Sequence, residues 1–160
     1  MAEPAAEDGA RVVVGVDGSP SSKAALRWAV RQARLTGARV EAVTAWQLPT
    51  YYGWDLLPDS ADMEGIARSM LEEAIAGVTT LASGVKIQPM VRQGNAAQVL
   101  LDAAEGAELL VVGSRGHGGF TEALLGSVGQ HCVHHATCPV VVIRDGPGTA
   151  EWHSTQPAGI

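Results

Sequence analysis

A glycine-rich stretch in the second half of the chain has the residue types and spacing of a phosphate-binding loop. It follows an apolar run ending at Val112, contains Gly113, Gly116 and the pair Gly118-Gly119, and closes with Gly126-Ser127. Glycines let backbone amides approach an anion closely, and a helix N-terminus adds unpaired N–H groups and a favourable dipole. The sequence therefore predicts a two-part phosphate site made of a loop and the start of a helix.

Two standard phosphate loops are excluded by the residues present. A P-loop ends in Gly-Lys-Ser/Thr, and no lysine follows Lys86. The dinucleotide fingerprint needs glycine at its first, third and sixth positions, and counting from Gly116 the sixth position is Thr121. The chain also lacks a recognisable nucleophile with an adjacent base, so we predict binding and at most slow hydrolysis, with no catalytic residue assigned.

Short apolar runs and helical patterns alternate along the whole chain. Runs rich in β-branched residues predict strands at 12–16, 40–44, 85–91, 109–112 and 140–143. The third run alternates apolar with polar residues and contains Pro89, which is typical of an edge strand. This alternation predicts an α/β fold with a parallel sheet and right-handed crossovers.

Helix signals lie between the predicted strands. Ser19 and Pro20 form an N-cap and first turn, and Gly37 ends that helix. A second apolar pattern runs from Met63 to Leu81 and stops near Gly84. A third helix is expected to begin after its predicted cap, Asn95. A fourth covers 127–135, where Val128, Cys132 and Val133 are expected to face the core.

Composition and charge restrict the function and the location. The net charge of −6 disfavours nucleic acid as a partner, and no apolar run reaches the length of a membrane helix. The acidic start of the chain does not resemble a signal peptide, and its two cysteines do not form a disulfide framework. We therefore expect a cytoplasmic protein. Residues 1–9 and 145–160, including Trp152, are expected to be flexible tails, and the 46–60 loop has no assigned role.

Four segments resemble the ATP-binding branch of the universal stress protein family. They are the motif G-x2-G-x9-G-S formed by Gly113, Gly116 and Gly126-Ser127, the opening VVVGVDGSPSSKAALRWA, the MVRQG segment at 90–94 and the closing HATCPVVVIR. The resemblance extends over about residues 10–144. It implies a single doubly wound, five-stranded parallel sheet in the order 3-2-1-4-5, with helices on both faces.

The resemblance also implies where ATP, with or without Mg²⁺, would bind. Strands one and four end side by side at the point where the strand order reverses, which is where such folds bind ligands. The implied site residues are Gly15, Val16 and Asp17 beside the nucleoside; Thr44 and Ala45 by the base; Gly94 after the third strand; and Gly113, Ser114, Arg115, Gly116, His117, Gly118, Gly119, Gly126, Ser127 and Val128 around the phosphates.

Several of these assignments have alternatives. Asp17 could hold a magnesium ion or could be an ordinary turn aspartate before a glycine. His117 stands where the family often has arginine, which would weaken phosphate neutralisation. His131, Cys132, His134, His135 and Cys138 raise a metal hypothesis, but Cys132 fits the apolar stripe, so we expect structural or solvated roles.

The predicted function is a nucleotide-binding stress or signalling module. ATP would bias either a homodimer or binding to an unidentified protein partner. The resemblance, like the apolar edge strand, suggests that the homodimer forms through Val140, Val141, Val142 and Ile143. The alternatives are a slow ATPase or adenylate-transferring enzyme on the same fold, and a flavodoxin-like protein that holds an FMN phosphate in the hydroxyl-rich loop after the first strand.

Overall fold

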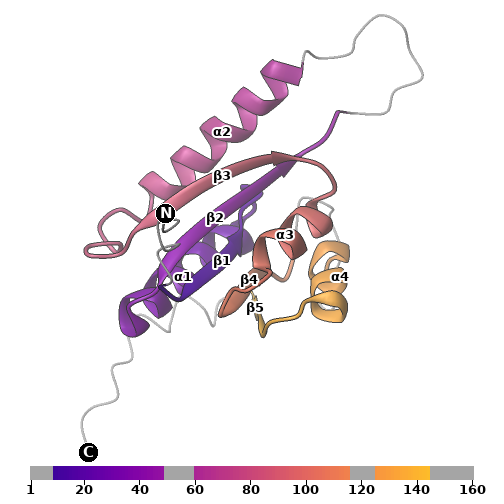
Figure 1. Cartoon of the computed structure of the whole chain (residues 1–160). Coiled ribbons are helices and arrows are strands. Elements are labelled where there is room, and N and C mark those ends of the chain that lie inside the picture. The colour runs from indigo at the N-terminus through magenta and orange to yellow at the C-terminus, as the bar shows by residue number, and fades with distance from the viewer. Residues whose placement is uncertain (1–8, 49–59, 116–124, 145–160) are drawn as a thin grey trace, which may run out of the picture.

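The computed structural model describes residues 9–48, 60–115 and 125–144, which form one parallel sheet with helices on both faces (Figure 1). The strand order is β3-β2-β1-β4-β5, which confirms the predicted fold and order. The strands are β1 (Arg11–Gly15), β2 (Arg39–Trp46), β3 (Ile87–Gln93), β4 (Leu109–Gly113) and β5 (Val140–Ile143), and the helices are α1 (Pro20–Thr36), α2 (Ser60–Ala76), α3 (Ala96–Ala104) and α4 (Ser127–His135).

Alternation along the strands divides the core into two layers. Val12 and Val14 of β1 pack with buried residues of α1 and α2, whereas Val13 packs with α3 and with Cys132 of α4. In Figure 1, α3 and α4 accordingly lie on one face of the sheet, and α1 lies on the other. Because both faces are covered, β4 and the interior of β1 are entirely apolar, whereas β2 also carries Glu41 and Thr44. No helix in the described ranges is long and apolar enough to cross a membrane.

Helix α1 begins and ends at the capping residues that the sequence predicts. The Ser19 hydroxyl accepts a hydrogen bond from the Ser22 amide at 3.3 Å, and Pro20 opens the helix. Gly37 adopts a left-handed φ of 78°, and its N–H donates to the Ala33 carbonyl at 2.8 Å. Such a residue stops a helix because only glycine adopts this conformation without steric cost. The predicted cap of α3 is also confirmed, since the Asn95 side chain accepts from the Gln98 amide at 3.2 Å.

The second helix is shorter than its apolar pattern predicts. It ends at Ala76, and residues 77–84 form turns. Gly77 weakens the helix at this point, and the Thr79 hydroxyl donates to the Ala76 carbonyl at 2.7 Å, competing with the helical ladder. Val78 is nevertheless buried and Leu81 packs against the core, so the apolar spacing continues beyond the helix itself.

One predicted core residue of α4 is exposed. Val133 has 48% of its surface accessible, whereas Cys132 is completely buried. The face that packs inward carries Gly129 and Cys132, and Val133 lies one position further around the helix. The prediction that Val133 faces the core is therefore wrong.

Candidate functional site

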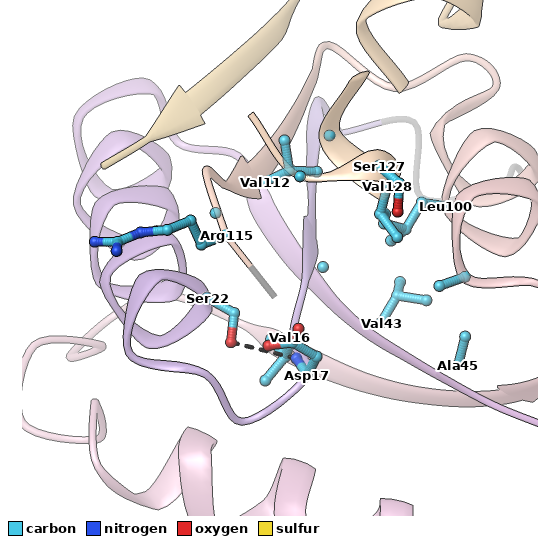
Figure 2. A pocket seen from close by; sticks show the side chains of 15 residues that line it. Val16, Asp17, Ser22, Val43, Ala45, Leu100, Val112, Arg115, Ser127 and Val128 are labelled. Carbon is cyan, nitrogen blue, oxygen red and sulfur yellow. Dashed lines mark hydrogen bonds between the residues drawn. The ribbon is translucent and has the colours of Figure 1, made fainter. Parts of the chain in front are cut away.

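A cavity of about 290 Å³ lies at the carboxyl ends of β1 and β4, where the strand order reverses (Figure 2). In doubly wound sheets this is the usual place for a ligand, and the volume is near the lower end of small-molecule pockets. Apolar side chains such as Val16, Val43 and Leu100 form much of its lining. Nine of the predicted site residues line it: Gly15, Val16, Asp17, Ala45, Gly113, Arg115, Gly126, Ser127 and Val128.

Asp17 forms part of the cavity wall and also organises the turn that follows β1. Its Oδ1 accepts a hydrogen bond from the Ser19 amide at 2.9 Å and another from the Ser19 hydroxyl. Its own N–H donates to the Ser22 hydroxyl oxygen at 3.3 Å, the contact drawn dashed in Figure 2. The turn and ligand interpretations of Asp17 are therefore compatible.

Gly113 is needed where β4 meets the first turn of α1. A Cβ at this position would lie 2.7 Å from the Ser21 carbonyl carbon and 2.8 Å from the Ser22 nitrogen. Close packing alone thus requires glycine here, whether or not a phosphate approaches. The Ser21 hydroxyl donates a hydrogen bond to the Arg115 carbonyl. The same hydroxyl oxygen accepts a hydrogen bond from the Arg115 backbone N–H, with 3.3 Å between nitrogen and oxygen. In Figure 2 the Arg115 side chain extends toward α1, on the opposite side of the view from Ser127 and Val128.

The start of α4 forms the opposite side of the cavity. The first N–H groups of a helix have no intrahelical acceptor, and here they belong to residues that line the cavity: Ser127, Val128 and Gly129. The N–H of Gly126 donates to the Ser114 carbonyl at 2.9 Å. The two ends of the glycine-rich stretch are therefore held side by side at the cavity.

Three other predicted residues that the structure describes, Thr44, Gly94 and Ser114, do not line this cavity. Thr44 is buried, and its hydroxyl donates to the Val16 carbonyl at 2.8 Å, so it supports the wall from behind. Gly94 lines an adjoining cavity of about 470 Å³. The Ser114 backbone accepts a hydrogen bond from the Gly126 N–H and donates one to the Ile143 carbonyl. Gly116, His117, Gly118, Gly119, the tails with Trp152 and residues 49–59 lie outside the described residues.

Sequence reasoning missed a second group of lining residues: Ser22, Val43, Ala96, Leu100, Val112 and Gly129. Apart from Ser22 and Gly129 they are apolar, and their sequence pattern indicates core. Leu100, for example, belongs to the apolar stripe of α3, but its side chain also reaches the cavity (Figure 2). Only the three-dimensional arrangement distinguishes a core position from a wall position here.

The thiols of Cys132, in α4, and of Cys138, just after it, do not add reactive chemistry. Burial, with a smaller contribution from Cys138, raises the pKa of Cys132 to about 11, and burial also raises the pKa of Cys138. Neutral thiols are poor nucleophiles and poor metal ligands. Within the described ranges, no three His, Cys, Asp or Glu side chains are placed to hold a metal ion together.

The fold and the cavity together define a doubly wound α/β domain with a ligand site at its topological switch point. The model of the universal stress protein family matches residues 10–144, and the chain belongs to this family. A universal stress protein of Mycolicibacterium smegmatis is 36% identical over 137 residues, and one of Mycobacterium tuberculosis is 37% identical over 135 residues. These alignments cover 83% and 84% of this chain but only 45% of each relative, so the chain spans about half the length of these relatives.

Solved structures share the fold of this domain. UspA from Lactobacillus plantarum superposes with a TM-score of 0.72 at 23% identity, covering 84% of this chain and 97% of that one, which supports the fold alone. A universal stress protein crystallised in complex with cAMP gives a TM-score of 0.63 at 26% identity, with the same coverage of both chains. That relative binds an adenine nucleotide.

Proposed function

We propose that this domain binds ATP and that its nucleotide state regulates self-association or binding to a protein partner. The observation that carries the proposal is the cavity at the ends of β1 and β4, which combines apolar walls with the amino end of α4. Apolar walls suit a purine and ribose, and helix N–H groups suit phosphates. The cAMP complex of a relative supports the nucleotide class, and the motif G-x2-G-x9-G-S supports ATP in particular.

The proposed orientation follows from the chemistry of the two ends of the cavity. The nucleoside lies against Val43, Ala45 and Leu100, and the phosphates lie near Ser127 and the glycine-rich stretch. Asp17 is the proposed contact for a magnesium ion. Its Oδ1 already accepts from Ser19, so we expect any such ion to be held mainly by the phosphates.

Isothermal titration calorimetry with ATP, ADP and cAMP tests the proposal directly. In Ser127→Ala the loss of one hydrogen bond to a charged phosphate weakens ATP binding about 10- to 100-fold. Ser69→Ala is the matched control, because it makes the same change at an exposed position of α2. The proposal is wrong if neither ATP nor ADP binds with a dissociation constant below about 1 mM, or if both variants bind ATP equally.

We also propose that two copies pair through β5, an edge strand of the sheet. The Leu110 amide donates to the Pro139 carbonyl at 3.0 Å, and the Ser114 amide donates to the Ile143 carbonyl at 2.8 Å. Backbone groups alternate in direction along a strand, so those of Val140 and Val142 point toward the open edge.

This direction gives a specific test of the dimer. Val142→Pro removes the outward N–H while an edge position tolerates proline, whereas Val142→Thr keeps the N–H. We expect sedimentation velocity to show a monomer for the proline variant and a dimer for the threonine variant. Equal masses for both folded variants would refute pairing through this edge.

The described residues do not favour the flavodoxin-like alternative. The hydroxyls of Ser19, Ser21 and Ser22 make internal hydrogen bonds to Asp17, Arg115 and Ser19 respectively, so the loop that would hold an FMN phosphate is already engaged. Release of phosphate above background that depends on Ser127 would instead point to an ATPase on the same fold.

A further inference from the structure

Two histidines on α4 lie together on the surface of the domain. His131 and His135 are one helical turn apart, both are exposed, and their ring centres are 4.5 Å apart with the ring planes inclined at 41°. His134, between them in sequence, lies on another side of the helix, with its ring centre 6.5 Å from that of His135. The pair at positions 131 and 135 is therefore the one that shares a face.

The distance between these rings is suited to binding one metal ion. A zinc or copper ion lies about 2 Å from a ligating imidazole nitrogen, and so about 3 Å from the ring centre. For a nitrogen–metal–nitrogen angle of about 90–110°, the two ring centres are then about 4.5–5 Å apart. Two histidines four positions apart on a helix are also the ligand pair of the H-E-x-x-H zinc motif.

The surroundings of the pair favour a cation. His131 and His135 border a groove of about 270 Å³ between α3 and α4, and Asp102 and Glu105 line the same groove. The Asp102 carboxylate accepts a hydrogen bond from the Gln98 side chain at 2.8 Å, which fixes its position. Two carboxylates beside a concave surface raise the local concentration of cations.

We propose that His131 and His135 chelate a divalent first-row transition metal ion, such as Zn²⁺ or Cu²⁺. No third His, Cys, Asp or Glu in the described part of the chain is placed to complete the site. Water therefore completes the coordination, and affinity follows the order in which these ions bind imidazole, with Cu²⁺ tightest. This proposal departs from the structural or solvated role that the sequence suggests for the histidines.

Because of where this pair lies, a bound metal would stabilise α4, the helix that begins at the proposed nucleotide site. Ser127, His131 and His135 follow one another at four-residue spacing, so they lie along one side of α4. His131 also lines the cavity that adjoins the proposed nucleotide site, together with Ser127. A helix of nine residues is marginal by itself, and a metal bridge across its last turn stabilises it.

The test uses the untagged full chain without nucleotide, titrated with ZnCl₂ by calorimetry and with CuSO₄ by electron paramagnetic resonance. We expect the wild-type spectrum to show two nitrogen ligands on one copper ion. His131→Ala and His135→Ala should each weaken Zn²⁺ binding by at least roughly tenfold, since even the loss of an outer-shell partner of a metal site costs about 10- to 100-fold. His134→Ala is the matched control on the same helix and should bind Zn²⁺ like the wild type.

A second readout guards against variants that fold poorly. Zn²⁺ should raise the Tm of the wild type and of His134→Ala, but not of the other two variants, whose circular dichroism should match the wild type. The proposal fails if His131→Ala and His135→Ala bind as many metal ions as the wild type with equal affinity. It also fails if His134→Ala loses as much affinity as they do. Either result leaves the proposed nucleotide site unaffected, because that site is tested without transition metals.

Discussion

Adding a methyl group at Gly113 tests the close packing of the start of α1 against the end of β4, where the cavity lies. The new Cβ would lie 2.7 Å from a backbone carbon of Ser21 and 2.8 Å from the backbone nitrogen of Ser22, well inside the 3.4 Å at which ordinary contact begins. Both atoms belong to the start of α1, so relief requires moving the helix and not merely rotating a side chain. We therefore expect Gly113→Ala to separate α1 from the end of β4.

The size of the effect follows from three contributions. Overpacking costs about 1–3 kcal/mol. Displacing α1 also weakens the hydrogen bonds between the Ser21 hydroxyl and the Arg115 backbone, each worth about 1 kcal/mol. Alanine restricts the unfolded chain and so offsets about 0.4–1 kcal/mol of this loss. The net destabilisation is about 2–4 kcal/mol, which lowers the Tm of a domain of this size by roughly 5–15 °C.

Urea unfolding followed by far-ultraviolet circular dichroism measures this loss. Gly65→Ala is the matched control, because a Cβ there meets no other atom within 4 Å and the position is inside α2. The control should stabilise the protein by about 0.5–1 kcal/mol. If Gly113→Ala unfolds within about 0.5 kcal/mol of the wild type, α1 does not pack on β4 as described. Loss of ATP binding in Gly113→Ala would not by itself identify a phosphate contact.

Three further predictions concern the supports of the site and of the sheet. In urea unfolding, Asn95→Ala should lower the free energy of unfolding by about 1 kcal/mol because α3 loses its cap. Asn95→Asp keeps a capping oxygen and should unfold like the wild type. Gly15→Ala places a Cβ 2.9 Å from a terminal methyl of Leu100, so calorimetry should show weaker ATP binding with a smaller stability loss than Gly113→Ala. Glu41→Gln should destabilise by about 1–3 kcal/mol in the same unfolding assay, because Glu41 is buried and pairs with Arg11 at 3.2 Å.

Local signals predicted most of the fold. Ser19, Pro20, Gly37 and Asn95 act through backbone groups within a few residues, and such effects are visible in the sequence. The alternating pattern and Pro89 are also local signals, and they correctly predicted that β3 lies at an edge of the sheet. Glu41 could not be interpreted in this way. It lies within a central strand. Arg39 precedes it by two positions on the same strand, but its other partner, Arg11, belongs to β1 and meets it only after β1 and β2 pair.

Local chemistry predicted the candidate site only where backbone groups mark it, whereas Asp17 and Ala45 were predicted from the family resemblance. The glycines and the start of α4 could be recognised because phosphate chemistry needs them. Leu100 could not be recognised, because the same side chain fills the core and faces the cavity. Gly113 was recognised for an incomplete reason, since its contact with Ser21 depends on where α1 packs.

The two sides of the cavity differ in how firmly they are held, and this difference bears on the proposed signalling. Asp17 is bonded to Ser19 and Ser22 at the start of α1, a helix of 17 residues that packs on several strands. The other side is the start of α4, a helix of nine residues that leads within five residues to β5. A ligand that joins the two sides should therefore move α4 more than α1. Because β5 follows α4 directly, a shift of α4 offers a short physical route from the proposed nucleotide site to the proposed dimer edge.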